Sequence, residues 1–182
     1  LSHQFDMPDC PGPEGLEDDS VRWEKLREFM SKKSQGKTSR ERPALRPIEM
    51  RSVEPIDFIN PVPRPAHQLV WIKASGSMDA LGLADDAAMH SAILAYASDF
   101  NLMGTSMMPH GISFVDPKLQ PASLDHCIWF HDSFRADEWL LYSMDSPRSS
   151  HSRGLSRGSF YTRDGRLVAS TIQEGLIRMH KD

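Results

Sequence analysis

Apolar residues cover nearly every side of one helical segment in the middle of the chain, residues 84–101. At helical spacing, one face of this segment carries Met89, Ala92, Tyr96, Asp99 and Met103. A second face carries Ile93, Ala97 and Phe100. A helix that is apolar on all sides is usually buried, so the pattern predicts a buried helix with a single acid in its apolar stripe.

The acid, Asp99, has two structural interpretations that need no function. Asn101 and Gly104 indicate that the helix ends nearby, so Asp99 can cap the turn that follows. It can also form an ion pair with a buried arginine. At the other end of the segment, Asp85 and Asp86 stand where a cap and a partner for the helix dipole are expected.

The remaining patterns predict strands on both sides of this helix. Residues 46–54 read as an edge strand, and the prolines of residues 59–68 exclude a central one, since each proline removes a hydrogen-bond donor from the ladder. Residues 67–76, 121–131 and 138–146 read as strands. Residues 153–180 read as a long hairpin whose turn is Asp164-Gly165. A curved antiparallel sheet around one helix, an α+β fold, explains this order.

The N-terminal region has a different composition. Residues 7–15 are rich in proline, glycine and acids and are typical of a linker. A short amphipathic helix is expected from Asp18 or Ser20, with Trp23, Leu26 and Met30 on its apolar edge. Residues 31–43 are polar and basic, and we interpret them as a solvated loop. A nucleic-acid-binding patch is the alternative, but this stretch lacks interleaved aromatic residues.

Overall composition narrows the class of protein. A length of 182 residues suits one domain with a real core, and the 39% hydrophobic and 25% charged residues are typical of a globular chain. The formal net charge of −4 argues against a general nucleic-acid binder. Cys10 and Cys127 are too few for a disulfide framework, and no spacing suggests a metal site. No apolar run is long enough to span a membrane. The start at Leu1, without an initiator methionine or a signal-peptide pattern, suggests a fragment or a processed chain.

Six stretches resemble the acyl-CoA thioesterase II family in order and spacing. They are residues 96–101 (YASDFN), 109–114 (PHGISF), 124–131 (LDHCIWFH), 138–143 (EWLLYS), 157–170 (RGSFYTRDGRLVAS) and 170–175 (STIQEG). The resemblance implies a hotdog fold, a curved antiparallel sheet wrapped around one long central helix. Family members normally carry two hotdogs in tandem, and this chain resembles the second. Residues 1–45 then correspond to an interdomain linker with a short helix and a basic loop, and residues 46–182 to the C-terminal hotdog thioesterase domain.

The resemblance also implies a catalytic set. The family uses Asp, Thr and Gln; Asp99 and Gln173 match, and Ser123 stands at the threonine position. Serine keeps the hydroxyl group, so its hydrogen-bonding role is preserved. A carboxylate can accept a proton from water while a hydroxyl and a carboxamide hold that water in line with a thioester carbonyl. Gln173 shares a strand face with Ala169, Thr171 and Gly175, which are small enough to leave room for a substrate. No metal and no cofactor is expected, because coenzyme A is part of the substrate.

Other chemically capable residues have simpler interpretations. His110, His126 and His131 are not accompanied by a Gly-x-Ser-x-Gly elbow, so we interpret them as satisfied core or loop histidines. Cys127 lies in an apolar strand and is expected to be buried. Two groups have a second possible role. Arg153 and Arg157 are either solvated strand residues or partners of coenzyme A phosphates. Met103, Met107 and Met108 either fill the core or line an acyl pocket.

The resulting hypothesis is an acyl-CoA thioesterase that hydrolyses fatty acyl-CoA to a fatty acid and coenzyme A through an activated water. The alternative is a non-catalytic hotdog module that binds acyl-CoA or serves assembly. The expected partners are the fatty acyl-CoA substrate, the missing N-terminal hotdog and, for the fragment, further copies of itself, so that it forms a homodimer. The family's eukaryotic members are commonly peroxisomal, so the peroxisome is the expected location. The chain ends without a Ser-Lys-Leu-type address, which leaves the cytoplasm as the alternative.

Overall fold

The computed structural model describes residues 1–33 and 47–180. These residues form a seven-stranded sheet, three α-helices and three short 3₁₀ turns. The strands are β1 (Ile48–Ser52), β2 (His67–Ala74), β3 (Leu119–Ser123), β4 (Cys127–Phe130), β5 (Leu140–Ser150), β6 (Arg153–Thr162) and β7 (Leu167–Met179). The helices are α1 (Asp19–Lys33), α2 (Ala87–Ala97) and α3 (Leu102–Thr105), and the 3₁₀ turns are η1 (Pro13–Gly15), η2 (Asp79–Leu81) and η3 (Met108–His110).

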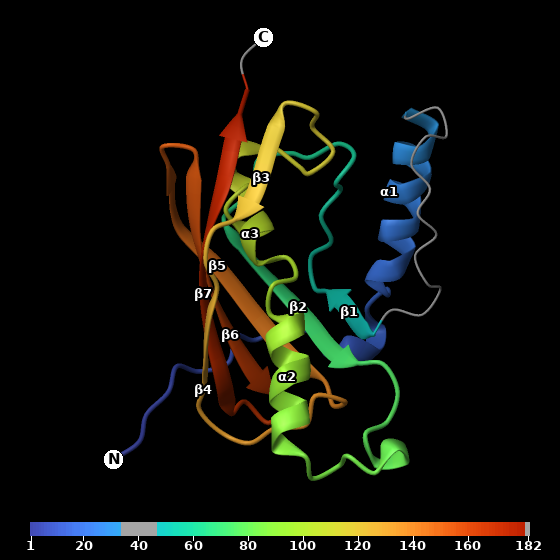
Figure 1. The fold of residues 1–182 in the computed structure, drawn as a ribbon, viewed down its shortest axis with the longest axis vertical. Helices are drawn as coiled ribbons and strands as arrows, with labels where there is room; N and C mark the ends of the chain where they lie inside the picture. The colour runs from blue at the N-terminus through green and yellow to red at the C-terminus, as the bar shows by residue number, and fades with distance from the viewer. Residues whose placement is uncertain (34–46, 181–182) are drawn as a thin grey trace.

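All paired strands are antiparallel, in the order β1-β2-β5-β6-β7-β3, and β4 also pairs with β7. The sheet curves, and α2 and α3 run one after the other along one of its faces (Figure 1). The expected α+β architecture is therefore confirmed. The edge position of β1 is confirmed as well. The hairpin turns where it was predicted, but Arg163 and Asp164 form the centre of the turn and Gly165 follows them at a φ of 87°, which favours glycine.

The core between the sheet and α2 is organised around Tyr142 of β5. Its ring stacks on Phe160 of β6 with 3.9 Å between ring centroids, and both side chains are fully buried. The ring also lies against Gly158, where a Cβ atom would overlap it. Leu94 and Ala97 of α2 pack into the same cluster. The absence of a side chain at Gly158 thus lets an aromatic ring pass close to the sheet.

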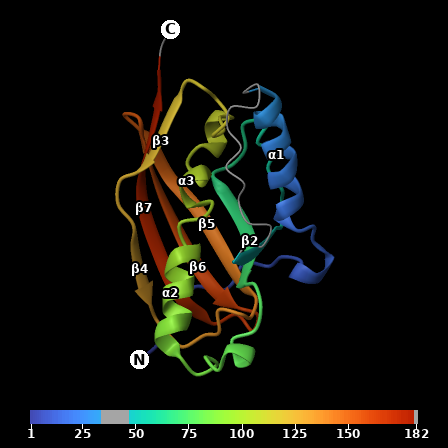
Figure 2. The ribbon, with the colours of Figure 1, turned by 45° about the vertical axis from the view of Figure 1, so that its right-hand side comes forward.

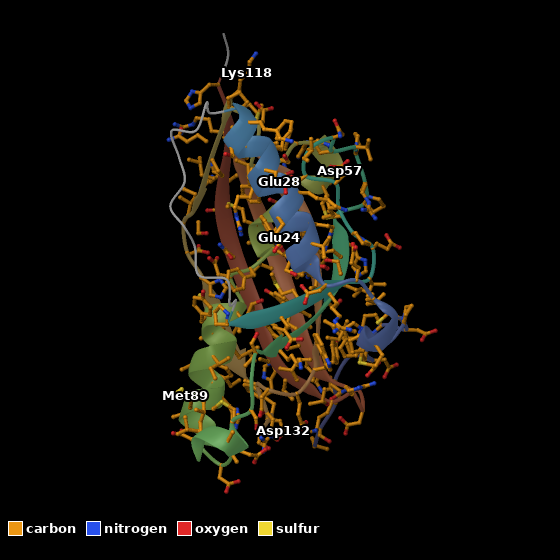
Figure 3. The ribbon with its side chains drawn as sticks, turned by 90° about the vertical axis from the view of Figure 1, so that its right-hand side faces the viewer. Glu24, Glu28, Asp57, Met89, Lys118 and Asp132 are labelled. Atoms are coloured by element: carbon orange, nitrogen blue, oxygen red, sulfur yellow. The ribbon has the colours of Figure 1, made fainter. Side chains whose placement is uncertain are left out.

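The central helix is shorter and more exposed than the sequence predicts. It ends at Ala97, and only His90, Leu94 and Ala97 are buried, whereas Met89 and Tyr96 are 39% and 56% exposed. The expectation of a helix buried on all sides is wrong because the sheet covers only one side of α2. Met89 lies on the outer side (Figure 3). The cap at Asp86 is confirmed, since its carboxylate accepts a hydrogen bond from the backbone N–H of Met89 at 2.9 Å.

The predicted strand at residues 121–131 is two strands separated by a β-bulge. Ser123 pairs with Gly175 and Cys127 pairs with Ile172, so four steps along one strand match three along β7. The extra residue is accommodated at 124–126, where the Asp125 carboxylate accepts the backbone N–H of Glu174 at 2.7 Å. Such a bulge reverses the alternation of side chains on its C-terminal side.

The N-terminal residues lie against the sheet and lead into α1. The Asp19 carboxylate is buried and accepts hydrogen bonds from the backbone N–H and the hydroxyl of Ser52 in β1, at 2.9 and 2.7 Å. Further along α1, Trp23 stacks on Phe58 with 5.0 Å between ring centroids. The helix stands beside the sheet on the side of β1 and β2 (Figure 2).

The basic loop predicted for residues 31–43 is only partly covered by the described residues. Residues 31–33 belong to α1 and not to the predicted basic loop, because the helix continues to Lys33. The rest of that loop, up to residue 43, lies outside the described residues.

Candidate active site

The side-chain amide of Gln173 joins the three residues that the resemblance singles out. Gln173 lies on β7 and is 1% exposed. Its Nε2 donates to Asp99 Oδ1 at 3.0 Å and to Ser123 Oγ at 2.6 Å. Asp99 comes from the turn between α2 and α3, and Ser123 is the last residue of β3. Three segments distant in sequence therefore meet at one nitrogen atom.

The two hydrogens of the Gln173 amide nitrogen fix the roles of its two partners. Each partner accepts one hydrogen, so Ser123 Oγ acts as an acceptor here and its own hydroxyl hydrogen is left to point elsewhere. Asp99 Oδ2 accepts no hydrogen bond from any residue in the described part of the chain. Asp99 and Ser123 are both exposed. A carboxylate oxygen and a hydroxyl hydrogen are thus available to a molecule that arrives from outside.

Neither structural interpretation of Asp99 describes what it contacts. No arginine pairs with it among the described residues, and it does not cap α3, whose N-cap position is Asn101. Asn101 has a φ of 65°, in the left-handed region that asparagine tolerates better than most residues. The turn that Asn101 completes places Asp99 beside β7, where Gln173 contacts it.

His126 contacts the other end of the same amide, a role that the sequence interpretation missed. Its Nδ1 lies 3.1 Å from Gln173 Oε1 and its Nε2 lies 2.7 Å from Ser98 Oγ. In a regular strand, residues three apart point to opposite faces, so Ser123 and His126 could not both contact Gln173. The bulge at 124–126 brings them to one face. The one signal in the sequence was His126 itself, a polar residue on the side of the predicted strand that otherwise carries Ala122, Leu124, Ile128 and Phe130.

The buried phenol of Tyr142 is hydrogen-bonded to the turn that follows α2. Tyr142 Oη donates to the backbone carbonyl of Ser98 at 2.7 Å and lies 3.1 Å from Thr171 Oγ1. Burial raises the pKa of the Tyr142 phenol far above its ordinary value. The hydrogen bond with Thr171 lowers this pKa in part, and the negative charge of Asp99 raises it further. The phenol therefore keeps its proton and remains a donor to the residue that precedes Asp99.

An apolar cavity of about 240 Å³ opens beside Asp99 and Ser123. Its walls include α1, the segment between β1 and β2, and the segment from α3 to residue 114. The apolar side chains lining it are Trp23, Met50, Ile56, Phe58, Val62, Phe100, Met103, Met107, Met108, Ile112 and Phe114. Arg64, Gln68, Asn101 and Ser113 also line the cavity, and mostly apolar walls with a few polar groups are typical of a small-molecule site.

The small residues around Gln173 do not provide this space. Ala169, Thr171 and Gly175 are buried as expected for one strand face. A Cβ atom at Gly175, however, would lie 2.7 Å from both Cγ and Sδ of Met103, so α3 already fills the room above it. The expectation of substrate space at this position is wrong, because the gap admits the helix instead.

The remaining candidates take ordinary surface roles. Arg153 and Arg157 form exposed ion pairs with Glu174 at 3.4 Å and Asp145 at 2.6 Å, as solvated strand residues do. His110 and His131 are exposed and contact Ser149 Oγ and Ser170 Oγ at 2.7 and 2.9 Å. Cys127 is exposed, so the expectation that it is buried is wrong. Its strand β4 lies at the border of the sheet, where one side has no covering layer in the described structure.

Within residues 1–33 and 47–180, His, Cys, Asp and Glu do not gather in a group of three that could hold a metal ion. None of the helices formed there has the length and apolar character needed to cross a bilayer.

Comparisons with known proteins point to one family. A family model described as acyl-CoA thioesterase matches residues 61–176. The chain is 37% identical over 181 residues to acyl-coenzyme A thioesterase 8 of Mus musculus, which covers 98% of this chain and 55% of that protein. The crystal structure of acyl-CoA thioesterase II TesB2 from Mycobacterium marinum matches with a TM-score of 0.70 at 36% identity, covering 100% of this chain and 59% of that one.

The fold is confirmed by a more distant structure. A protein with a hot dog fold from Alicyclobacillus acidocaldarius matches with a TM-score of 0.59 at 14% identity, over 100% of this chain and 58% of that one. The chain spans between 55% and 59% of the relatives described here. Its expected correspondence to one half of a longer family member agrees with this coverage.

Proposed function

The chain belongs to the acyl-CoA thioesterase family, and from that premise we propose that it supplies the catalytic residues for hydrolysis of fatty acyl-CoA. The observation that carries the proposal is the single amide nitrogen of Gln173 bound to both Asp99 and Ser123. This arrangement holds a carboxylate and a hydroxyl at a fixed separation beside an apolar cavity. Both groups face the opening and not the core.

In the proposed reaction, water attacks the thioester carbonyl carbon. Asp99 accepts a proton from the water as the new carbon–oxygen bond forms, and the carbon–sulfur bond then breaks. The proton passes on to the leaving sulfur, which gives a fatty acid and the thiol of coenzyme A. Gln173 and Ser123 hold the carboxylate and the water in line with the carbonyl. No side chain forms a covalent bond with the acyl group.

We assign the acyl chain to the apolar cavity next to the site. Its lining is mostly apolar and includes Asp99 and Ser123, so a chain that fills the cavity can place its thioester beside those two residues. Met103, Met107 and Met108 supply flexible side chains that can adapt to an alkyl group. The exposed ion pairs of Arg153 and Arg157 give no reason to assign the phosphates of coenzyme A to them.

A second hotdog domain is the proposed partner in the whole protein. Asp99, Ser123 and the neighbouring Tyr96 and Leu124 are all exposed. An active site of this chemistry excludes bulk water more effectively when a second domain covers it. The chain also spans only about half of the relatives it matches, which leaves length for such a domain in those proteins.

The experiment is hydrolysis of fatty acyl-CoA by the whole protein, followed through the thiol that coenzyme A releases. The parent should turn over, and Asp99→Asn, which keeps the size and removes the base, should lose about a hundredfold or more in kcat. Its thermal unfolding should match that of the parent. An Asp99→Asn variant with the parental rate would contradict the water mechanism. A parent that binds acyl-CoA without turnover would instead support the non-catalytic module.

Location remains a separate proposal. The family resemblance favours the peroxisome, with the cytoplasm as the alternative. A fluorescent fusion of the whole protein, imaged with a peroxisomal marker, distinguishes the two compartments.

A further inference from the structure

The orientation of the Gln173 amide depends on a donor on its far side. A primary amide can turn by half a rotation about its last bond, which exchanges the nitrogen and the oxygen. The turned form would place Oε1 against the Asp99 carboxylate, oxygen against oxygen. The observed form requires that whatever faces Oε1 carry a hydrogen, because a carbonyl oxygen only accepts. The atom that faces it is His126 Nδ1, at 3.1 Å.

Ser98 contacts the other nitrogen of the imidazole ring and holds the ring in place. In the neutral ring with hydrogen on Nδ1, Nε2 is an acceptor, and the Ser98 hydroxyl at 2.7 Å donates to it. The same hydroxyl can instead donate to the Ala95 carbonyl, 2.8 Å away, and accept from a protonated Nε2. Ser98 is therefore compatible with Nε2 either bare or protonated, and it is the carbonyl oxygen of Gln173, which only accepts, that requires the hydrogen on Nδ1. Ser98 is fully buried and adjoins Asp99, so the ring also ties β7 to the turn that bears the carboxylate.

We propose that His126 is a positioning residue that keeps the Gln173 nitrogen turned towards Asp99 and Ser123 during catalysis, an inference that rests on the proposed function. Three groups contact the amide in the resting site, but only the acceptor Asp99 and the donor His126 fix which way it faces, because the Ser123 hydroxyl can either accept from Nε2 or donate to Oε1. When Asp99 takes the proton of the attacking water, its negative charge is lost and its restraint weakens. The restraint from His126 is unchanged at that moment. Loss of His126 should therefore lower kcat more than it raises KM.

The test is a double-mutant cycle in the whole protein. His126→Ala should reduce kcat about tenfold with KM changed less than about twofold, which is the range expected for one lost hydrogen bond. In a Gln173→Ala background the same change should have no further effect, because His126 acts through that amide. Full additivity of the two losses would overturn the proposal. His131→Ala, which removes an exposed histidine bound to Ser170, is the matched control and should keep the parental kcat.

A conservative variant separates positioning from packing. His126→Asn puts an amide nitrogen at the same number of bonds from Cβ as Nδ1, so it can still donate to Gln173 Oε1 while losing the Ser98 contact. It should recover most of the kcat lost in His126→Ala. A rate for His126→Asn as low as that of His126→Ala would overturn the proposal.

A measurement on the unmutated protein tests the proposal even if the variants fail to fold. Imidazole nitrogen NMR under conditions where the ring is neutral should show His126 with its hydrogen on Nδ1, and the opposite tautomer would overturn the proposal. This result does not require turnover. A parent without thioesterase activity would therefore remove the proposed function while the NMR still decides how His126 and Gln173 are arranged.

Discussion

Ser123 stands where the family resemblance implies a threonine, and its contact shows how a serine can serve there. Gln173 Nε2 donates to the hydroxyl oxygen at 2.6 Å, and an added methyl group would not alter that acceptor. Ser123 is also exposed, so the methyl group would not have to displace a core side chain. We therefore expect this position to need a hydroxyl and to tolerate an added methyl group.

Substitutions at Ser123 should separate the hydroxyl from the methyl group. Ser123→Thr should keep kcat for fatty acyl-CoA within about threefold, whereas Ser123→Ala should lose about tenfold or more, since one hydrogen bond to the reacting groups is removed. Steady-state kinetics on the three whole proteins make the comparison. Equal rates in all three would mean that the hydroxyl has no catalytic role.

Substitution of Gly158 is expected to reduce the stability of the fold without acting directly on the chemistry. A Cβ atom there would overlap the Tyr142 ring and lie 2.6 Å from Thr171 Oγ1. Gly158→Ala should therefore lower the free energy of unfolding by about 1–3 kcal/mol, the usual cost of overpacking a core. Gly15→Ala is the control, because no atom lies within 4 Å of its added Cβ. Chemical denaturation that ranks the two variants equally would refute the packing role of Gly158.

At the scale of elements, the bulge between β3 and β4 matters more than either strand alone. It lets Ser123 and His126 reach one amide although they are three residues apart. Alternation of apolar and polar residues predicted residues 121–131 as one strand. Such a pattern cannot reveal an inserted residue that has no partner on the neighbouring strand. The bulge is stabilised by Asp125 and Glu174, a contact between segments distant in sequence, so it could not be found locally.

The same reasoning explains which parts of the fold and site the sequence could predict. Local signals located β1, β2, the Asp86 cap and the turn of the hairpin between β6 and β7. The resemblance singled out Asp99, Ser123 and Gln173, and the structure brings their side chains together. The exposed side of α2 could not be deduced, because a helix sequence does not say how many of its sides a sheet will cover. His126 was missed because its importance depends on the register of β7.

Helix α1 is expected to tune the choice of acyl chain. Trp23 lines the cavity and stacks on Phe58, while the buried Asp19 fixes the start of the helix on β1. Trp23→Ala should enlarge the cavity and raise kcat/KM for long-chain or branched acyl-CoA relative to short-chain acyl-CoA. Competition between two chain lengths measures this ratio directly.

The control for this experiment is another tryptophan. Trp139 packs against the cations of Arg51 and Lys73 and does not line the cavity. Trp139→Ala should leave the acyl preference unchanged even where it reduces stability. An identical shift in both variants would show that the preference does not come from the cavity wall.

At the scale of the whole molecule, the chain presents exposed apolar side chains near its candidate site and on the outer face of an open sheet border. Tyr96 and Leu124 are 56% and 51% exposed, and Trp129 of β4 is 52% exposed. Strand β4 pairs with β7 on one side and has no second partner strand in the described structure. Open strand borders and apolar patches of this kind promote association.

The isolated 182-residue chain should therefore associate with itself. We expect a two-fold dimer at micromolar concentration, in which a second copy covers the surface that a second hotdog would cover in the whole protein. Sedimentation should give about twice the mass of 20.6 kDa. Tyr96→Ser should shift the equilibrium towards monomer, while Leu81→Ser, an exposed apolar residue on η2, should not. A stable monomer of the parent chain would contradict this expectation.

The buried amide of Gln173 also restricts how this protein can evolve. Single-nucleotide changes of a glutamine codon lead to Glu, Lys, Arg, His, Leu, Pro or a stop codon, and none of these offers an amide that donates twice and accepts once. Glutamate would set a second carboxylate against Asp99, and leucine would leave both Asp99 and His126 without their partner. Serine at position 123, by contrast, reaches threonine in one mutational step without loss of the hydroxyl. Lineages that keep the activity should thus drift between serine and threonine at position 123 while position 173 stays fixed.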